Sequence, residues 1–261
     1  MAEQSPTATM PRYDFHSPRL YVAAALLSGH TLDLDPAQAN YLRNVLRLRA
    51  GAPVLVFNGR DGEWHATLAE SGKRAMSLVL SEQTRSQTIP LDLHYLFAPL
   101  KHARLDYMVQ KAVEMGASRL QPVLTRHTQA TRVNLERMHA NAIEAAEQCG
   151  ILTLPEIGAA ISLEQMLAER KPERLLIFCD EDAEVKDPLA ALAAVRPAAG
   201  STPMPLAVLI GPEGGFAEDE RIALLRAPNV VRLALGPRIL RADTAAVAAL
   251  ALVGAVLGDW R

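Results

Sequence analysis

Two short segments carry the residue types most typical of a ligand site. They are LIGPEGGFAEDE, residues 209–220, and LGPRILRADTA, residues 235–245. Each begins where an apolar run reaches a Gly-Pro pair, so each is expected to leave a strand at the carboxyl edge of an α/β sheet, where such proteins bind ligands. Glycine permits close backbone approach and proline fixes the chain, which favours a rigid slot for a flat, uncharged heterocycle. Two ordinary tight turns are the alternative.

The first turn is placed like a phosphate-binding loop, but its residues do not suit phosphate. A P-loop ends in Lys and a hydroxyl residue, whereas this turn leads into Glu218, Asp219 and Glu220. Three carboxylates at a helix start repel a triphosphate. The chain also lacks the G-x-G-x-x-G, G-x-S-x-G and H-E-x-x-H motifs. Cys149 and Cys179 are too few for a disulfide scaffold or a Cys-based zinc site, so we predict no metal.

The elements that must position these turns lie in residues 91–261. Strand-like apolar runs alternate there with amphipathic helices, which predicts an α/β fold with a mostly parallel sheet covered on both faces. One predicted helix runs from an Asn134 cap to Cys149 and ends at Gly150. The apolar segment 244–258 is shorter than the ~20 residues of a membrane span, so we expect it to be a buried helix.

Residues 18–84 form a different pattern, with short β segments around one helix at 36–48. A turn at 58–62 predicts a hairpin, and the whole is compatible with a small β-barrel. Residues 1–17 have no signal-peptide pattern and are expected to be a flexible tail of a cytoplasmic protein. The formal net charge is −2, so any contact with nucleic acid must come from a local basic surface.

Taken together, several motifs resemble the RsmE family, the 16S ribosomal RNA uridine-N3 methyltransferases of the SPOUT superfamily. The two Gly-Pro turns contribute, as do RLYV, LRNVLRLRAGAPVLVFNG, PLKHARLDYMVQKAVEMGASRLQPVLTRHT and EAAEQCG, so the resemblance spans nearly the whole chain. It implies a PUA-like β-barrel domain (18–84), a SPOUT methyltransferase domain (91–261) with a C-terminal trefoil knot, bound S-adenosyl-L-methionine and a homodimer. The sequence departs from the family pattern at Ile151 and Asp243.

The resemblance also implies which residues hold the cofactor. One wall of its pocket is expected from the first Gly-Pro turn and a second wall from the other turn, with a third from the segment after LLIFCD. The residues implied are Ile210, Gly211, Pro212, Glu213, Gly214, Gly215, Leu235, Gly236, Ile239, Leu240 and Ala245.

Methylation at N3 requires loss of the ring proton and an unpaired base, because N3 lies on the pairing edge. Arg241 and Arg104 are candidates to stabilise the developing anion, and Asp243 or Glu213 to accept the proton. A salt bridge from Arg241 to either carboxylate is the structural alternative. The candidate contacts with 16S ribosomal RNA, in the small ribosomal subunit, are Arg12, Arg19, Arg43, Arg47, Arg49 and Lys101.

Two other functions remain open from the sequence. A SPOUT relative could methylate a ribose 2′-hydroxyl or a tRNA base with the same cofactor slot. A ribosome-assembly factor could instead use the β module and its basic helix without catalysis. Nucleoside analysis separates the first alternative from uridine-N3 methylation, and cofactor binding separates the second.

Overall fold

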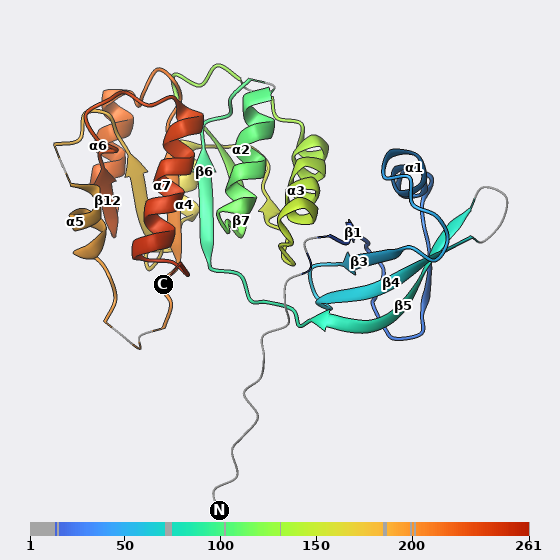
Figure 1. Cartoon of the computed structure of the whole chain (residues 1–261). Coiled ribbons are helices and arrows are strands. Elements are labelled where there is room, and N and C mark those ends of the chain that lie inside the picture. The colour runs from blue at the N-terminus through green and yellow to red at the C-terminus, as the bar shows by residue number, and fades with distance from the viewer. Residues whose placement is uncertain are drawn as a thin grey trace, which may run out of the picture. The chain divides into compact units, whose positions relative to one another are not determined.

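The computed structural model in Figure 1 describes residues 14, 16–70, 75–101, 103–130, 132–184, 187–198, 200 and 202–260. The chain divides into two compact units, Met1–Thr88 and Ile89–Arg261. Most of the predicted N-terminal tail lies outside the described residues, and so does Arg12, which was predicted to contact RNA.

The first unit is a five-stranded β module. Its strands are β1 (Arg19–Tyr21), β2 (Thr31–Asp33), β3 (Pro53–Phe57), β4 (Glu63–Glu70) and β5 (Met76–Arg85), in the order β1-β3-β4-β5-β2. The predicted hairpin is present, because β3 and β4 pair antiparallel across the 58–62 turn. Asn58 closes that turn by accepting hydrogen bonds from the N–H groups of Arg60 and Asp61. Alternate strand residues and Leu42 are buried together in its core.

The helix of this unit differs from its prediction. Residues 36–48 were expected to form one amphipathic helix, but α1 (Pro36–Asn40) passes into a π-helical turn, η1 (Tyr41–Val45). The N–H of Leu46 donates to the carbonyl of Tyr41 at 2.9 Å, an i→i+5 bond that widens the turn. Arg47 then takes a positive φ of 57°, which ends the helix.

The second unit contains a parallel sheet with the order β12-β10-β11-β6-β7-β8, and β9 pairs with β7. Every strand pair in this unit is parallel. The predicted α/β class follows from apolar runs such as LLIFC and LAVLI, which are buried almost throughout. The strands are β6 (Leu93–Phe97), β7 (Arg119–Leu124), β8 (Glu156–Ile157), β9 (Ile161–Ser162), β10 (Leu175–Cys179), β11 (Leu206–Ile210) and β12 (Val230–Leu233).

Helices cover this sheet on both faces (Figure 1). The helices are α2 (Ala103–Glu114), α3 (Leu135–Cys149), α4 (Leu163–Glu169), α5 (Pro188–Ala193), α6 (Glu218–Arg226) and α7 (Ala242–Val256). Leu163 and Met166 of α4 and Leu224 of α6 pack with Leu96, Leu176 and other alternate strand residues. The opposite strand face meets α2 and α7, as in the contact of the Tyr95 hydroxyl with the Met108 sulfur.

Local signals account for most helix ends. Asn134 caps α3 by accepting from the N–H of Arg137, and Gly150 ends it with a left-handed conformation, as predicted. Ser162 caps α4 in the same way. The segment 244–258, predicted to be a buried helix, lies largely within α7, whose interior face is buried. No helix among the described residues is long and apolar enough to cross a membrane.

Candidate active site

The carboxyl ends of the parallel strands lie level with one another and form the floor of the site. Cys179 at the end of β10 pairs in register with Ile210 of β11 and with Leu233 of β12. Ile210 in turn pairs with Phe97 at the end of β6, and Phe97 pairs with Pro122 of β7. Loops that follow five neighbouring strands are therefore brought to one edge.

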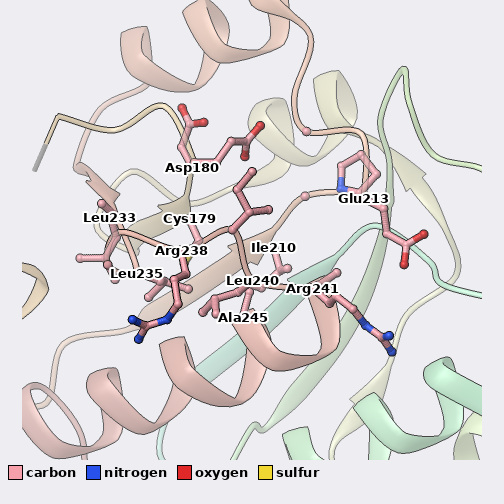
Figure 2. A pocket seen from close by; sticks show the side chains of 18 of the residues that line it. Cys179, Asp180, Ile210, Glu213, Leu233, Leu235, Arg238, Leu240, Arg241 and Ala245 are labelled. Atoms are coloured by element: carbon pink, nitrogen blue, oxygen red, sulfur yellow. The ribbon is translucent and has the colours of Figure 1, made fainter. Parts of the chain in front are cut away.

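A cavity of about 470 Å³ lies over the ends of β12, β10 and β11, a volume within the usual range for small ligands. Figure 2 shows the side chains around it, with Arg238 and Arg241 leaving the second loop on opposite sides. All eleven residues predicted from the two Gly-Pro turns line this cavity, and the segment after β10 lines it as well. Its lining comprises 179–181, 210–215, 233–242 and Ala245.

Two glycines of the first loop leave no room for a side chain. A Cβ on Gly211 would lie 2.9 Å from the Phe216 ring, which packs edge-on against Phe178 in the core. Gly215 has a positive φ of 69°, where L-residues are strained, and a Cβ there would lie 2.2 Å from the Glu181 carboxylate. These positions therefore require glycine, and the loop backbone forms the wall of the cavity.

The second loop presents backbone groups to the cavity. Among the residues that the structure describes, the backbone N–H groups of Leu235, Ile239 and Leu240 have no hydrogen-bond partner within the protein. Apolar side chains stand beside them, including Ile210 and Ala245 (Figure 2). Free backbone donors next to apolar walls suit a neutral heterocycle, which needs edge hydrogen bonds and face contacts.

The two loops run in opposite directions along the sheet edge. After β11 the first loop leads to α6, which contacts β12, while after β12 the second loop leads back to α7, which contacts β11 and α2. Each loop thus connects to an element beside the strand from which the other loop departs. Two segments that lie about twenty residues apart in the chain therefore line one cavity.

Asp180 anchors the third wall. Its carboxylate is fully buried and accepts hydrogen bonds from Arg221 and Arg232, both at 2.8 Å. Burial alone would raise the pKa of Asp180, but these guanidinium groups and the N–H of Asp182 outweigh it and lower the pKa. Burial, with the negative charge of Asp180 beside it, raises the pKa of the Cys179 thiol to about 12, so that thiol stays protonated.

A second cavity, of about 340 Å³, lies over the ends of β11, β6 and β7. It shares Pro212 and Glu213 with the first cavity, so the β11 loop separates the two. The guanidinium of Arg104, on α2, forms an ion pair with the carboxylate of Glu213. The residues lining this second cavity are Pro99, Leu100, Lys101, Arg104, His127, Gln129, Pro212 and Glu213.

Arg241 and Asp243 stand where the second loop enters α7. Arg241 is the N-cap residue of this helix, and its exposed guanidinium lies 3.5 Å from the carboxylate of Asp243. Burial raises the pKa of Asp243, but the N–H of Thr244 and the Arg241 guanidinium outweigh it and lower the pKa. The salt bridge considered as the alternative role of Arg241 is therefore present, as a long contact. The side chains of Arg241 and Glu213 extend to the same side of the first cavity (Figure 2).

The residues predicted to contact RNA occupy different environments. For Arg19 the prediction is wrong, because its side chain is buried, lies 3.0 Å from the carboxylate of Glu63 and donates to the carbonyl of Asp14. Arg47 and Arg49 are exposed beyond η1, and Arg43 within it is half-buried. Lys101 is exposed and lines the second cavity.

His127 is the site residue that the sequence reasoning missed. It lies in a tight turn after β7, and its ring lines the second cavity between α2 and the first Gly-Pro loop. The only signal in the sequence was its position just past the end of a predicted strand, on the edge where ligands bind.

Comparison with known proteins identifies the class. Residues 87–254 match the family model of an RNA methyltransferase domain, and residues 34–81 match that of an RNA methyltransferase PUA domain. A PUA-like β module followed by an α/β catalytic domain is therefore an RNA methyltransferase arrangement, which confirms the fold class and enzyme class predicted from the sequence.

Individual relatives narrow this class. The ribosomal RNA small subunit methyltransferase E of Rickettsia conorii is 31% identical over 90% of this chain and 94% of its own length. The protein of the same name from Synechocystis is 32% identical over 92% of this chain and 78% of its own. The chain belongs to the ribosomal RNA small subunit methyltransferase E family.

Two solved structures have the same fold and hold a ligand. The Neisseria gonorrhoeae ribosomal RNA small subunit methyltransferase E, bound to S-adenosyl methionine, has a TM-score of 0.82 at 28% identity, covering 94% of this chain and 100% of that one. A Legionella pneumophila methyltransferase with the same bound cofactor has a TM-score of 0.79 at 28% identity, covering 94% and 99%. The C-terminal trefoil knot stays a prediction.

Proposed function

We propose that this protein transfers the methyl group of S-adenosyl-L-methionine to N3 of one specific uridine in the 16S ribosomal RNA of the small subunit. One observation carries the proposal: two cavities lie side by side on the carboxyl edge and share only the β11 loop. The walls of the first are largely loop backbone and apolar side chains, with charged side chains such as Glu181 and Arg238 among them, and the second is lined by Lys101, Arg104 and His127. A neutral heterocycle fits the first cavity and a polyanion the second.

S-adenosyl-L-methionine fits the first cavity on the chemistry of its lining. The backbone N–H groups of Leu235 and Leu240, which donate to no described residue, suit the edge of an adenine ring, and Ile210 and Ala245 suit its faces. The carboxylates of Glu181 and Glu213 at the rim favour the positive charge of a sulfonium. When bound, the cofactor supplies an electrophilic methyl group.

The residues of the chain would contribute mainly by positioning and charge. The rigid first loop would hold the cofactor beside the second cavity. Alignment of the methyl group with the ring nitrogen would then supply part of the rate enhancement. Arg104 and Arg241 would stabilise the negative charge that develops on the uracil ring. The predicted proton acceptors, Asp243 and Glu213, are each already paired with one of these arginines.

Arg43, Arg47, Arg49 and Lys101 would bind RNA phosphates, which gives affinity without sequence specificity. We further propose a cytoplasmic homodimer. Its support in this chain is Ile239 at the tip of the second loop, an apolar side chain that is 91% exposed. Light scattering of the wild type and of Ile239→Asp would test the dimer, and a wild-type monomer at micromolar concentration would contradict it.

The function is tested by incubating the protein and labelled S-adenosyl-L-methionine with small subunits from a strain that lacks the modification. Digestion and nucleoside mass spectrometry then identify the product. Label in N3-methyluridine is the expected result. Label on a ribose or on another base would overturn the substrate assignment while keeping the enzyme class. An absence of both label and cofactor binding would support the assembly-factor alternative.

A further inference from the structure

Methylation of a ring nitrogen that carries a proton needs a group to accept that proton, and the two predicted carboxylates are poorly suited. Asp243 has a lowered pKa and lies beside Arg241. Glu213 forms an ion pair with Arg104. A carboxylate already paired with a guanidinium is a weaker base, since proton uptake would break the pair. The identity of the proton acceptor rests on the proposed function, because only methylation at N3 requires one here.

His127 lies on a turn that is held from two sides. Within the turn, the N–H of Thr125 donates to the Thr128 hydroxyl at 2.9 Å, and the N–H of Thr128 donates back to the Thr125 carbonyl at 3.1 Å. Toward α6, the N–H of Arg126 donates to Glu220 at 2.8 Å, and the Arg126 guanidinium pairs with Asp219. Such a turn presents a side chain with little freedom to move.

The imidazole ring has a defined proton arrangement. Its Nδ1 lies 3.2 Å from the carbonyl oxygen of Gly214 and 3.1 Å from that of Gly215. Because carbonyl oxygens only accept hydrogen bonds, Nδ1 must carry the hydrogen and donate it. In the neutral ring Nε2 is then an acceptor. No described residue forms a hydrogen bond with Nε2, and the ring lines the second cavity.

The ring is also packed against the loop that separates the cavities. A Cβ added to Gly214 would lie 3.2 Å from the Cβ of His127 and 3.6 Å from its Cγ, so the absence of a side chain at Gly214 lets the ring lie over the loop. His127 is thus fixed to the same loop whose other side lines the cofactor cavity. His127 therefore lines the second cavity directly beside the loop that borders the cofactor cavity.

We infer that the second cavity receives the target uracil and that Nε2 of His127 accepts its N3 proton. In this step the N3–H bond breaks, and the proton passes to Nε2 to give an imidazolium. The electron pair left on N3 forms the bond to the methyl carbon. The bond between that carbon and the sulfonium sulfur breaks with its pair going to sulfur, which leaves a neutral thioether. The imidazolium later releases its proton to solvent.

Charged groups of both signs surround this histidine. Lys101 and Arg104 from the β6–α2 segment line the same cavity and favour the neutral ring, whereas Glu213 on the β11 loop favours the imidazolium. Arg126 on its own turn, and Asp219 and Glu220 at the start of α6, form a further mixed group that is paired internally.

The test is the pH dependence of single-turnover methyl transfer to small subunits. In the wild type the rate should rise as His127 loses its proton and then level. His127→Ala should lower the neutral-pH rate by roughly 10²–10⁴-fold, the usual contribution of a general base. The rate of this variant should continue to climb with pH, because hydroxide then removes the proton. Added imidazole should restore part of its activity.

His127→Asn separates catalysis from positioning. An amide nitrogen there can still donate to the carbonyls of Gly214 and Gly215 but cannot accept the proton, so this variant should be as slow as His127→Ala. Cofactor Kd, measured by calorimetry, should be unchanged in both variants. His139→Ala is the matched control, since His139 is exposed on α3 and lines neither cavity.

The possible results are distinct. Wild-type rates in the His127 variants, or a loss of rate with the same pH profile and no effect of imidazole, would overturn the inference. If wild-type protein made N3-methyluridine, such a result would leave the proposed function intact. If the wild-type product were methylated on a ribose or another base, the proposed function would fail, and the assignment of an N3 proton to His127 with it.

Discussion

The two cavities at the carboxyl edge are built from different materials. The first is walled mainly by loop backbone and apolar side chains, with glycines at 211 and 215 where a side chain has no room, and it has charged side chains such as Glu181 and Arg238 in its lining. The second is lined by cationic and polar side chains from three separate segments. One arrangement recognises a molecule by shape and backbone hydrogen bonds, while the other offers charge and proton transfer. Substitutions should therefore affect the two cavities in different ways.

The difference also extends to what holds each cavity in place. The first depends on a buried ion network around Asp180, whose carboxylate has no exposed surface. The second depends on the ion pair of Arg104 and Glu213, and both of these side chains are more than two-fifths exposed. Buried ion pairs are strongly destabilising when one partner is removed, whereas exposed pairs contribute little to stability. Loss of the first network should unfold the protein, and loss of the second pair should mainly reduce activity.

The largest expected effect is from Asp180→Asn. Removing the buried charge leaves Arg232 without its carboxylate partner Asp180, and it leaves Arg221 with only the exposed carboxylates of Glu181, Asp182 and Glu218. Breaking a buried pair in this way costs about 3–5 kcal/mol of unfolding free energy. Urea unfolding measures it. The matched control is Asp182→Asn, because Asp182 contacts the same Arg221 but is 67% exposed, and its loss should cost less than about 1 kcal/mol.

The contribution of Asp180 to the unfolding free energy should also depend on pH. The pKa of Asp180 is lowered in the folded state from its ordinary value of 3.8. Its stabilisation is therefore fully present above that value and is lost as the pH falls below it, when the folded carboxylate takes up a proton. The stability difference between wild type and Asp180→Asn should thus shrink below about pH 4. A difference that stayed constant down to pH 2 would contradict the role given to this charge.

Arg104→Gln should give the next largest effect, and on activity rather than on stability. Loss of one group that stabilises developing negative charge typically lowers kcat by roughly 10²–10³-fold. Cofactor Kd should stay the same, because Arg104 lines only the second cavity. Single-turnover rates with saturating cofactor measure the change. Arg226→Gln, in the last turn of α6, is the control. A weakened cofactor affinity in Arg104→Gln would show that the cavities are not separate.

Gly211→Ala addresses the first cavity alone. Its new methyl group would meet the Phe216 ring, which is buried and packed against Phe178. Overpacking of this kind costs about 1–3 kcal/mol, so we expect the loop to shift and cofactor Kd to rise roughly tenfold. Phe216→Leu in the same chain should restore much of the affinity by making room. Failure of this second substitution to help would point to a cause other than the contact with the ring.

The same contrast explains how much the sequence could predict. The first cavity comes from two continuous motifs, each an apolar strand followed by Gly-Pro, and the family resemblance that these motifs carry implied eleven of its lining residues. The parallel sheet was predictable because its central strands β10 and β11 are uninterrupted apolar runs that alternate with helical segments. The second cavity has no such motif. Arg104 and Glu213 are 109 residues apart, and His127 meets Gly214 across 87 residues, so only the folded chain brings them together.

Arg19 and the helix of the first unit show two further limits. Arg19 was predicted to contact RNA because it is basic and near the start of the module, but its partner Glu63 lies 44 residues away and both are buried. Periodicity over 36–48 predicted one regular helix, although a single wide turn at 41–45 leaves the apolar spacing almost unchanged. No pattern in the neighbouring sequence indicates that a charged side chain will be buried or that a helix will contain an i→i+5 turn.

The smallest effect is expected from the basic residues beyond η1, and it should leave both cavities unaffected. Arg47 is exposed and held in a left-handed conformation that ends the helix, and Arg49 is exposed two residues later. If each of these arginines contacts a phosphate, Arg47→Gln should weaken RNA binding modestly. The slope of the logarithm of the binding constant against the logarithm of salt concentration should also fall by about one. Arg47→Lys keeps the charge and should keep that slope. Fluorescence titrations over a range of salt concentrations measure both. Because cofactor Kd and the rate at saturating RNA should not change, a loss of rate in Arg47→Gln would mean that the β module takes part in placing the target base.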